Sequence, residues 1–302
     1  MNGTIHDYAR VGIVHFMAYP ACAGGEGPVL ESIQRIANDT YFEVIELTRI
    51  KDDAQRMAVR SITEQAKVDL YFGAQPILLG GGFDLNHADM AERQKAIDAV
   101  KSGIEQAQEL ACKGVAVLSG KVSADKAAAT QRLVDSLKEL AAYARSKGMP
   151  LVLETFDQVP FGKNCLIGPN ANAVAVSKEV RKEYPDFGIM LDLSHLPLQY
   201  EESAPAIKLA GEHLVHAHIG NCAMDDPAHT AYGDNHPRFG APGTRNDVKE
   251  LSEYLRALLD NGYLSTKNRR VLSFEVKPMA GEDSEAIIAG SKRTLDEAWR
   301  FV

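Results

Sequence analysis

The sequence predicts a single (β/α)8 barrel, and three observations lead to this fold. Short apolar runs alternate with amphipathic helical stretches along the whole chain. There are eight such runs, which suits a closed parallel sheet covered by helices. No linker, low-complexity tract or charge block divides the chain, so residues 1–302 form one predicted domain.

The predicted strands are apolar and rich in β-branched residues, as strands buried on both faces are. A doubly wound open sheet is the alternative fold, and it would require a Gly-rich dinucleotide-binding turn after the first strand. Residues 23–28 (AGGEGP) lack the GxGxxG spacing and are interpreted as a loop. The eight strands are Val11–Tyr19, Phe42–Ile50, Asp69–Leu79, Gly114–Ser119, Pro150–Phe156, Phe187–Leu193, Leu214–Ile219 and Arg270–Val276.

Between the strands, apolar residues recur every three or four positions, as they do on one face of a helix. Gly148 follows one of these stretches and is the residue type that ends a helix. Pro169-Asn170 marks the start of the helix after the fifth strand. The other predicted helices are Ala91–Lys113, Ala124–Lys147, Asp247–Asp260 and Ser284–Phe301.

Composition narrows the possible partners and the compartment. The formal net charge of −8 disfavours nucleic acid, because an acidic surface repels phosphate backbones. No apolar run approaches membrane-spanning length, and the N-terminus (MNGTIHDYAR) has no signal-peptide core. The four cysteines form no CxxC pair and no zinc spacing, so we expect reduced, buried thiols in a cytoplasmic protein.

Polar side chains end four consecutive predicted strands. Glu154 lies in LVLETF, Asp192 in MLDLSH, His218 in LVHAHIG and Glu275 in LSFEVKP. Carboxylates that follow apolar strands are costly to bury unless they are paired or bind a metal. Because barrel strands deliver their carboxyl ends to one mouth, the four predict an oxygen-rich metal site. Mn²⁺ is the first choice for such a site, with Mg²⁺ or Co²⁺ as alternatives.

Buried ion pairs are the structural alternative to a metal site. Lys277, Arg238 or Arg245 would then neutralise the strand-end carboxylates. A separate question concerns the other histidines of the seventh strand. His216 lies two residues before His218, so its side chain is expected on the same face of the strand, one layer deeper in the barrel. It would either support the site or, in the favoured interpretation, be a hydrogen-bonded core residue. His213 is expected to face solvent.

The chain resembles members of the sugar phosphate isomerase/epimerase superfamily, the xylose isomerase-like barrels. The resemblance lies in the series Glu154, Asp192-x-x-His195, His218 and Glu275. The resemblance covers nearly the whole chain. It implies that Glu154, Asp192, His218 and Glu275 bind one divalent metal and that His195 contacts the substrate. It also implies that the two glutamates act as the acid/base pair.

Two loops on the predicted active face are longer than usual barrel connections, residues 157–168 and 221–246. The resembled epimerases carry an arginine shortly after the seventh-strand histidine, and this chain has none there. We therefore expect His236 and Arg238 of the second loop to bind substrate, with Arg245 as another source of the cation. Lys163 and Asn164 of the first loop are weaker candidates.

The resemblance leaves three activities open. The first is a metal-dependent isomerase or epimerase acting next to the carbonyl of a keto or aldo sugar. The second is a lyase, the catalytic subunit of a C-glycoside deglycosidase that cleaves 3-keto C-glycosides with a β-rich partner subunit. The third is a nuclease of the endonuclease IV kind, suggested by Asp234-x-His236 but disfavoured by the acidic charge. A non-catalytic binding module is a further alternative, which the carboxylates disfavour because such a module needs no acid/base pair.

Each activity carries its own expected partner. For the first two, we expect a small-molecule sugar or glycoside as substrate, and neither nucleic acid nor a membrane as partner. A homo-oligomer is the expected assembly of an isomerase or epimerase, and a hetero-oligomer with the β-rich subunit that of a deglycosidase.

Overall fold

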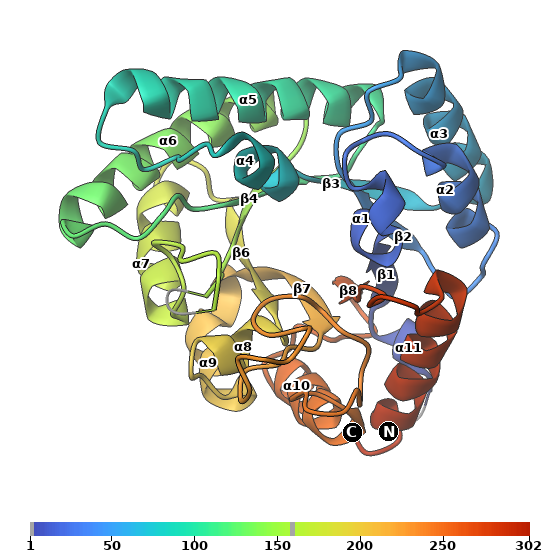
Figure 1. Cartoon of the computed structure of the whole chain (residues 1–302). Helices are drawn as coiled ribbons and strands as arrows, with labels where there is room; N and C mark the ends of the chain where they lie inside the picture. The colour runs from blue at the N-terminus through green and yellow to red at the C-terminus, as the bar shows by residue number, and fades with distance from the viewer. Residues whose placement is uncertain (1–2, 158–160) are drawn as a thin grey trace.

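Strand pairing in the computed structural model closes an eight-stranded parallel barrel, which confirms the predicted fold (Figure 1). Each strand pairs with the next, and β1 pairs with β8. The structure describes residues 3–157 and 161–302. The strands are β1 (Arg10–Val14), β2 (Val44–Leu47), β3 (Asp69–Gly73), β4 (Val115–Leu118), β5 (Leu151–Glu154), β6 (Gly188–Asp192), β7 (Leu214–Gly220) and β8 (Val271–Glu275).

Helices surround the barrel, and the long ones form an outer ring in Figure 1. The α-helices are α1 (His15–Ala18), α2 (Val29–Ala37), α3 (Asp53–Ala66), α4 (Gln75–Gly81), α5 (Met90–Glu109), α6 (Lys126–Ser146), α7 (Asn170–Arg181), α8 (His195–Leu198), α9 (Ser203–Ala210), α10 (Val248–Asp260) and α11 (Ser284–Trp299). Three short 3₁₀ segments complete the set, at Ile5–Asp7, Pro20–Cys22 and Gly211–His213.

Two predicted strands are too long, and each error has the same cause. The run Val11–Tyr19 divides into β1 and α1, and Asp69–Leu79 divides into β3 and α4. A continuous apolar run is compatible with a buried strand or a buried helix, so periodicity alone does not separate them. Pro76, in the first turn of α4, is the local signal that a helix starts there.

The helix predictions agree better because their termini carry side-chain signals. Asp247 caps α10 through a capping box with Glu250, and α7 begins after Pro169 as expected. Gly148 has φ 80°, the left-handed conformation that ends α6. Helix α5 stops at Glu109, four residues before the predicted end, because Ala111 takes a left-handed conformation with φ 58°.

The first described residues lie beside the C-terminal helix α11 at the outer edge of the molecule (Figure 1). The Trp299 Nε1–H donates to the Gly3 carbonyl at 3.1 Å. All four cysteines are buried and free, as predicted. In the part of the chain that the structure describes, we find no helix of the length and apolarity that crossing a membrane requires.

Strand register sets the height of the site residues in the barrel. Asp192 of β6 pairs with His218 of β7, and Gly220 of β7 pairs with Glu275 of β8. The ends of these strands therefore form one rim. The predicted loop 221–246 crosses this rim after β7, while loop 157–168 follows β5 and includes residues 158–160, which lie outside the described residues.

We expect Gly188→Ala to destabilise the barrel, because a Cβ at Gly188 would lie 2.3 Å from Val215 Cγ2 and 2.9 Å from the His213 carbonyl oxygen. Overpacking of this kind costs about 1–3 kcal/mol. Urea unfolding measures the loss. Gly290→Ala in α11 is the matched control: its Cβ meets no atom within 4 Å, and alanine in a helix is worth about 0.5–1 kcal/mol. Equal stability of both variants would contradict the packing argument.

Candidate metal and active site

Four of the predicted site residues meet at the carboxyl end of the barrel. Glu154, Asp192 and Glu275 are the last residues of β5, β6 and β8, and His218 lies near the end of β7. One ligand atom from each lies within 4.8 Å of the others, and all four residues are buried. The closed barrel thus brings together side chains that are up to 121 residues apart (275 − 154) in the chain.

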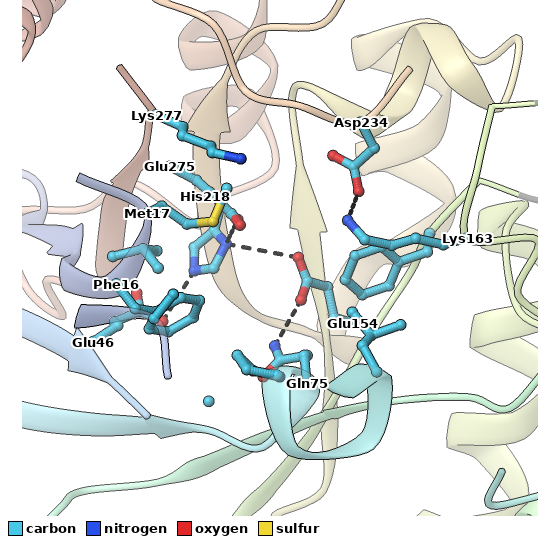
Figure 2. Close-up of a pocket in the computed structure, with 16 residues that line it drawn as sticks. Phe16, Met17, Glu46, Gln75, Glu154, Lys163, His218, Asp234, Glu275 and Lys277 are labelled. Atoms are coloured by element: carbon cyan, nitrogen blue, oxygen red, sulfur yellow. Dashed lines mark hydrogen bonds and ion pairs between the residues drawn. The ribbon is translucent and has the colours of Figure 1, made fainter. Parts of the chain in front are cut away.

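His218 lies between three carboxylates. Its Nδ1 is 2.8 Å from Glu275 Oε2 and 3.7 Å from Glu154 Oε1, while its Nε2 is 3.0 Å from Glu46 Oε2. On the other side of Glu154, Gln75 Nε2 donates to Oε2 at 2.7 Å. Figure 2 shows these contacts as dashed lines between side chains that line one pocket.

The donor set fits a divalent cation. Glu154 Oε1 and Asp192 Oδ2 are buried and have no hydrogen-bond partner among the described residues. A buried carboxylate oxygen without a partner is costly, so such atoms normally face a donor, water or a metal. Three carboxylates and one imidazole make an oxygen-rich set of the kind that Mn²⁺, Mg²⁺ or Co²⁺ prefers.

Protonation balances the charge of the metal-free cluster. Burial, together with the Glu275 carboxylate, raises the pKa of Asp192 to about 7. Burial lowers the pKa of His218, but Glu46 and the neighbouring carboxylates outweigh it and raise this pKa well above its usual value. Burial would raise the pKa of Glu275, yet the His236 and His218 imidazoles hold it well below its usual range. A bound cation would displace these protons.

A second polar cluster lies beside the first and joins the two long loops. His195 Nε2 is 3.1 Å and His236 Nε2 is 2.5 Å from Asp234 Oδ1. Lys163 Nζ forms an ion pair with Asp234 Oδ2, which ties the loop after β5 to the loop after β7. His195 and His236 are fully buried, so Asp234 and Lys163 are the members of this cluster that reach the cavity.

The backbone of the second cluster is unusual at one residue. His236 has φ 49°, a left-handed conformation that few non-glycine residues adopt. Its carbonyl oxygen accepts from the Lys277 N–H at 2.7 Å, which attaches the long loop to the end of β8. This bond and the Asp234 contact hold the imidazole against the metal-ligand candidates.

The structure does not bring Arg238 or Asn164 to the cavity. Arg238 Nε donates to Glu282 Oε1 at 3.0 Å, and its side chain is 42% exposed. Asn164 adopts φ 54° and donates from its amide to the Gly162 carbonyl at 3.3 Å. Arg245, the other candidate cation, pairs with Asp225. The path of the loops keeps these side chains away from the cavity lining, and strand periodicity does not predict that path.

The ion-pair alternative fails for the described residues. Arg238 and Arg245 pair with surface carboxylates, and Lys277 forms no ion pair with any residue in the described ranges. Instead Lys277 lines the cavity, where Figure 2 shows its ammonium group pointing into the hollow. The strand-end carboxylates therefore have histidines rather than basic side chains beside them.

The cavity next to the carboxylates has a volume of about 270 Å³. Its polar wall contains Glu154, His218 and Glu275 together with the lysines 163 and 277. The rest of its lining is apolar and comes mainly from the end of β1, from α1 and from α4, with Phe156 after β5. The apolar residues are Val14, Phe16, Met17, Ala23, Pro76, Leu79 and Phe156.

The histidines of β7 differ from each other in surroundings. His216 is buried, and its Nε2 lies 2.7 Å from Glu46 Oε1. It is hydrogen-bonded, as the favoured interpretation required, but to a residue that also contacts His218. His213 is half-buried rather than solvent-facing, because its Nδ1 lies 2.9 Å from Ser177 Oγ on α7.

Sequence reasoning missed Glu46 and Gln75 and gave Lys277 and Asp234 other roles. Glu46 lies one residue before the end of β2, but the apolar run FEVIELTRI continues past it to Ile50, so the strand-end rule that identified Glu154 does not single it out. Lys277 follows Glu275 by two positions, which places it on the same side of the strand. No sequence pattern marks Gln75 at the start of α4, and the Asp234-x-His236 pair indicated only the nuclease alternative.

Comparison with known proteins places this geometry in a family. The family model described as "Xylose isomerase-like TIM barrel" matches residues 35–298. This chain belongs to the xylose isomerase-like TIM barrel family. Among curated proteins, a D-psicose 3-epimerase of Ruminiclostridium cellulolyticum is 31% identical over 103 residues, 34% of this chain. That match spans about a third (33%) of the length of the epimerase.

Solved structures of other members share the barrel. An L-ribulose 3-epimerase matches with a TM-score of 0.74 at 20% identity and covers 97% of this chain and 96% of its own. A 3-keto-D-glucoside 4-epimerase from E. coli matches with a TM-score of 0.64 at 15% identity, over 97% and 98% of the two chains. At these identities the likeness concerns the fold.

We expect metal binding to release protons and to weaken in acid. Asp192, with a pKa of about 7, must be deprotonated to bind a cation, so affinity should fall as the pH drops below 7. Calorimetric titration with Mn²⁺ at pH 6 and pH 8, in buffers of different ionisation enthalpy, measures both effects. Asp192→Asn should remove this proton release; binding that is independent of pH in the native protein would contradict the assignment.

Proposed function

We propose that this chain is a divalent-metal-dependent sugar isomerase or epimerase that removes a proton next to the sugar carbonyl. The observation that carries the proposal is the pair Glu154 and Glu275, which both approach Nδ1 of His218, at 3.7 and 2.8 Å, and both line the cavity. A cavity with two carboxylates and an oxygen-rich donor set suits proton transfer at carbon. The epimerases named above support the sugar substrate.

Glu154, Asp192, His218 and Glu275 would hold the metal, with Mn²⁺ as the first choice and Mg²⁺ or Co²⁺ as alternatives. A divalent ion at this position supplies charge stabilisation for the oxygens of the enediolate. The chain's own task is to move the proton. One glutamate takes it from the carbon and becomes a carboxylic acid, while the electron pair moves to the carbonyl oxygen.

The fate of that proton decides the reaction. If the second glutamate starts as the carboxylic acid and delivers its proton to the opposite face of the same carbon, the product is the epimer and that glutamate ends as the carboxylate. If the proton returns to the neighbouring carbon, the product is the isomer. Gln75 Nε2 holds Glu154 Oε2, so Oε1 is the Glu154 oxygen without a hydrogen-bond partner among the described residues and the one that faces the site.

The second cluster positions the substrate. Asp234 and Lys163 reach the cavity, whereas His195 and His236 act through Asp234 because they are fully buried behind it. The His195 Nδ1–H donates to the Thr155 carbonyl at 2.8 Å, which fixes the ring. We therefore assign the sugar-hydroxyl contacts of this side to Asp234 and Lys163. Arg238 and Asn164 have no role in this proposal.

Lys277 is the cavity-lining cation that we assign to a second contact with the substrate. Lys163 is neutralised by Asp234, whereas Lys277 has no ion-pair partner among the residues described. Its ammonium would donate to a sugar oxygen, in place of the arginine that we expected from the loop. The surrounding carboxylates leave little excess positive charge, so the proposed substrate is a neutral sugar rather than a phosphate ester.

The apolar wall favours a second candidate, a lyase acting on 3-keto glycosides. Phe16, Met17 and Leu79 offer a surface that a free sugar does not use fully but an aglycone would cover. A structural neighbour is named as acting on a 3-keto-D-glucoside. In this reaction the electron pair of the enolate expels the substituent on the adjacent carbon, and the substituent leaves with a proton from the carboxylic acid.

Oligomeric state and location stay predictions from the sequence. A homo-oligomer accompanies the first candidate, and an assembly with a β-rich subunit accompanies the second. The substrate of either is a small molecule in a protein expected in the cytoplasm.

Proton NMR in D₂O with a panel of ketoses and 3-keto glycosides tests the function. We expect deuterium to enter at the carbon next to the carbonyl, with an epimer or isomer as product. A released aglycone would favour the lyase. Absence of both exchange and release across the panel in Mn²⁺-loaded protein would overturn the proposal.

In the same assay, Glu154→Gln and Glu275→Gln should each reduce turnover by about 10²–10⁴-fold, the range for loss of a general acid or base. Circular dichroism checks that the fold persists. Glu253→Gln on α10, whose side chain is 61% exposed, serves as the matched control and should turn over like the native protein. Near-native exchange in either site variant would remove that glutamate from the acid/base pair.

Lys277→Met should weaken substrate use by about 10–100-fold in kcat/KM, the value of a hydrogen bond to a charged group. Steady-state kinetics on the best ketose of the panel measures it, and Lys277→Arg should recover part of the loss. The exposed Lys267→Met is the control. An unchanged kcat/KM, or a clear preference for the phosphate ester over the free sugar, would contradict the assignment.

A further inference from the structure

Glu46 is a buried carboxylate whose two oxygens each contact a histidine of β7. Oε1 lies 2.7 Å from His216 Nε2, and Oε2 lies 3.0 Å from His218 Nε2. Glu46 comes from β2, almost across the barrel from β7, and it is 4% exposed. Glu275 also faces two imidazoles through separate oxygens, but its second contact, Oε1 to His236 Nε2, is longer, at 3.5 Å.

An ionised carboxylate only accepts hydrogen bonds, so both Nε2 atoms must carry hydrogen. For His218 this has a direct consequence. In the neutral ring, a proton on Nε2 leaves the lone pair on Nδ1, and Nδ1 is the atom that faces Glu275 Oε2 and Glu154 Oε1. Glu46 therefore selects the tautomer whose free nitrogen points at the other three ligand candidates.

His216 restrains Glu46 in turn. Its N–H holds the second carboxylate oxygen, and its ring packs edge-on against Tyr71 with centroids 5.3 Å apart. With both oxygens engaged, the carboxylate has one orientation. The deeper histidine of β7 thus acts on the shallower one through a residue from the opposite side of the barrel.

We propose that Glu46 is the positioning residue of the metal site: it fixes the tautomer and the ring orientation of His218, and His216 fixes Glu46. This inference rests on the metal dependence in the proposed function. Carboxylate–histidine–metal arrangements raise the basicity of the ligand, and loss of the outer carboxylate typically costs 10–100-fold in metal affinity.

Glu46→Gln is the sharpest test because it keeps the size of the side chain but removes the charge and one acceptor. We expect the dissociation constant for Mn²⁺, measured by calorimetry, to rise about 10–100-fold. Glu43→Gln is the matched control: Glu43 precedes β2 at the other end of the barrel and pairs with Arg269. Its Mn²⁺ affinity should equal that of the native protein.

A second readout needs no metal. Nitrogen-15 NMR of the imidazoles in metal-free protein, with His218→Asn for assignment, reports which nitrogen of His218 carries the hydrogen. At a pH high enough to leave the ring neutral, we expect the Nε2–H tautomer in the native protein and a mixture in Glu46→Gln. His216→Gln should give a smaller loss of Mn²⁺ affinity, and the double variant should bind no more weakly than Glu46→Gln alone.

These measurements separate the inference from the proposed function. If the native protein binds no Mn²⁺, the metal-dependent function fails. If it binds Mn²⁺ while Glu46→Gln has native affinity and an unchanged tautomer, the role of Glu46 fails and the function stands. If Glu46→Gln does not fold, His216→Gln decides: native affinity and tautomer in that variant overturn the inference.

Discussion

Burial of four carboxylates in one end of a closed barrel is the constraint on which the site depends. Glu46, Glu154, Asp192 and Glu275 are each at most 8% exposed. Negative charges that are this close together and shielded from water must be compensated by protons, by hydrogen-bond donors or by a cation. Histidines compensate Glu46 and Glu275, and an amide donor compensates half of Glu154. The remaining oxygens of Glu154 and Asp192 are the reason that the site calls for a metal.

The barrel and the ligand candidates could be read from the sequence because both follow from regular periodicity. Eight apolar runs give eight strands, and the carboxyl ends of parallel strands share one rim. Glu154, Asp192, His218 and Glu275 needed only their position at a strand end. Glu46 does not follow this rule, because the predicted strand Phe42–Ile50 continues past it, and the sequence alone does not place it at the rim.

Loop residues could not be placed in this way. Arg238 and Asp234 lie in the same loop, only four positions apart (238 − 234), yet one pairs with Glu282 at the surface and the other reaches the cavity. The direction of each side chain depends on the local backbone conformation. His236, for example, adopts a left-handed conformation that the sequence does not predict. Lys163 and Asp234 meet because two separate loops converge, a contact that neither loop encodes alone.

The hydrogen bonds of Glu46 and Gln75 connect the first half of the chain to the ligand candidates in the second half. All four ligand candidates belong to the second half, but the residues that orient Glu154 and His218 come from β2 and the start of α4. A fragment holding β5–β8 would carry the ligands without their supports. Closing the barrel and completing the site are therefore one event. Metal that binds only the closed form would add its binding free energy to the stability of the whole barrel, including strands that never touch it.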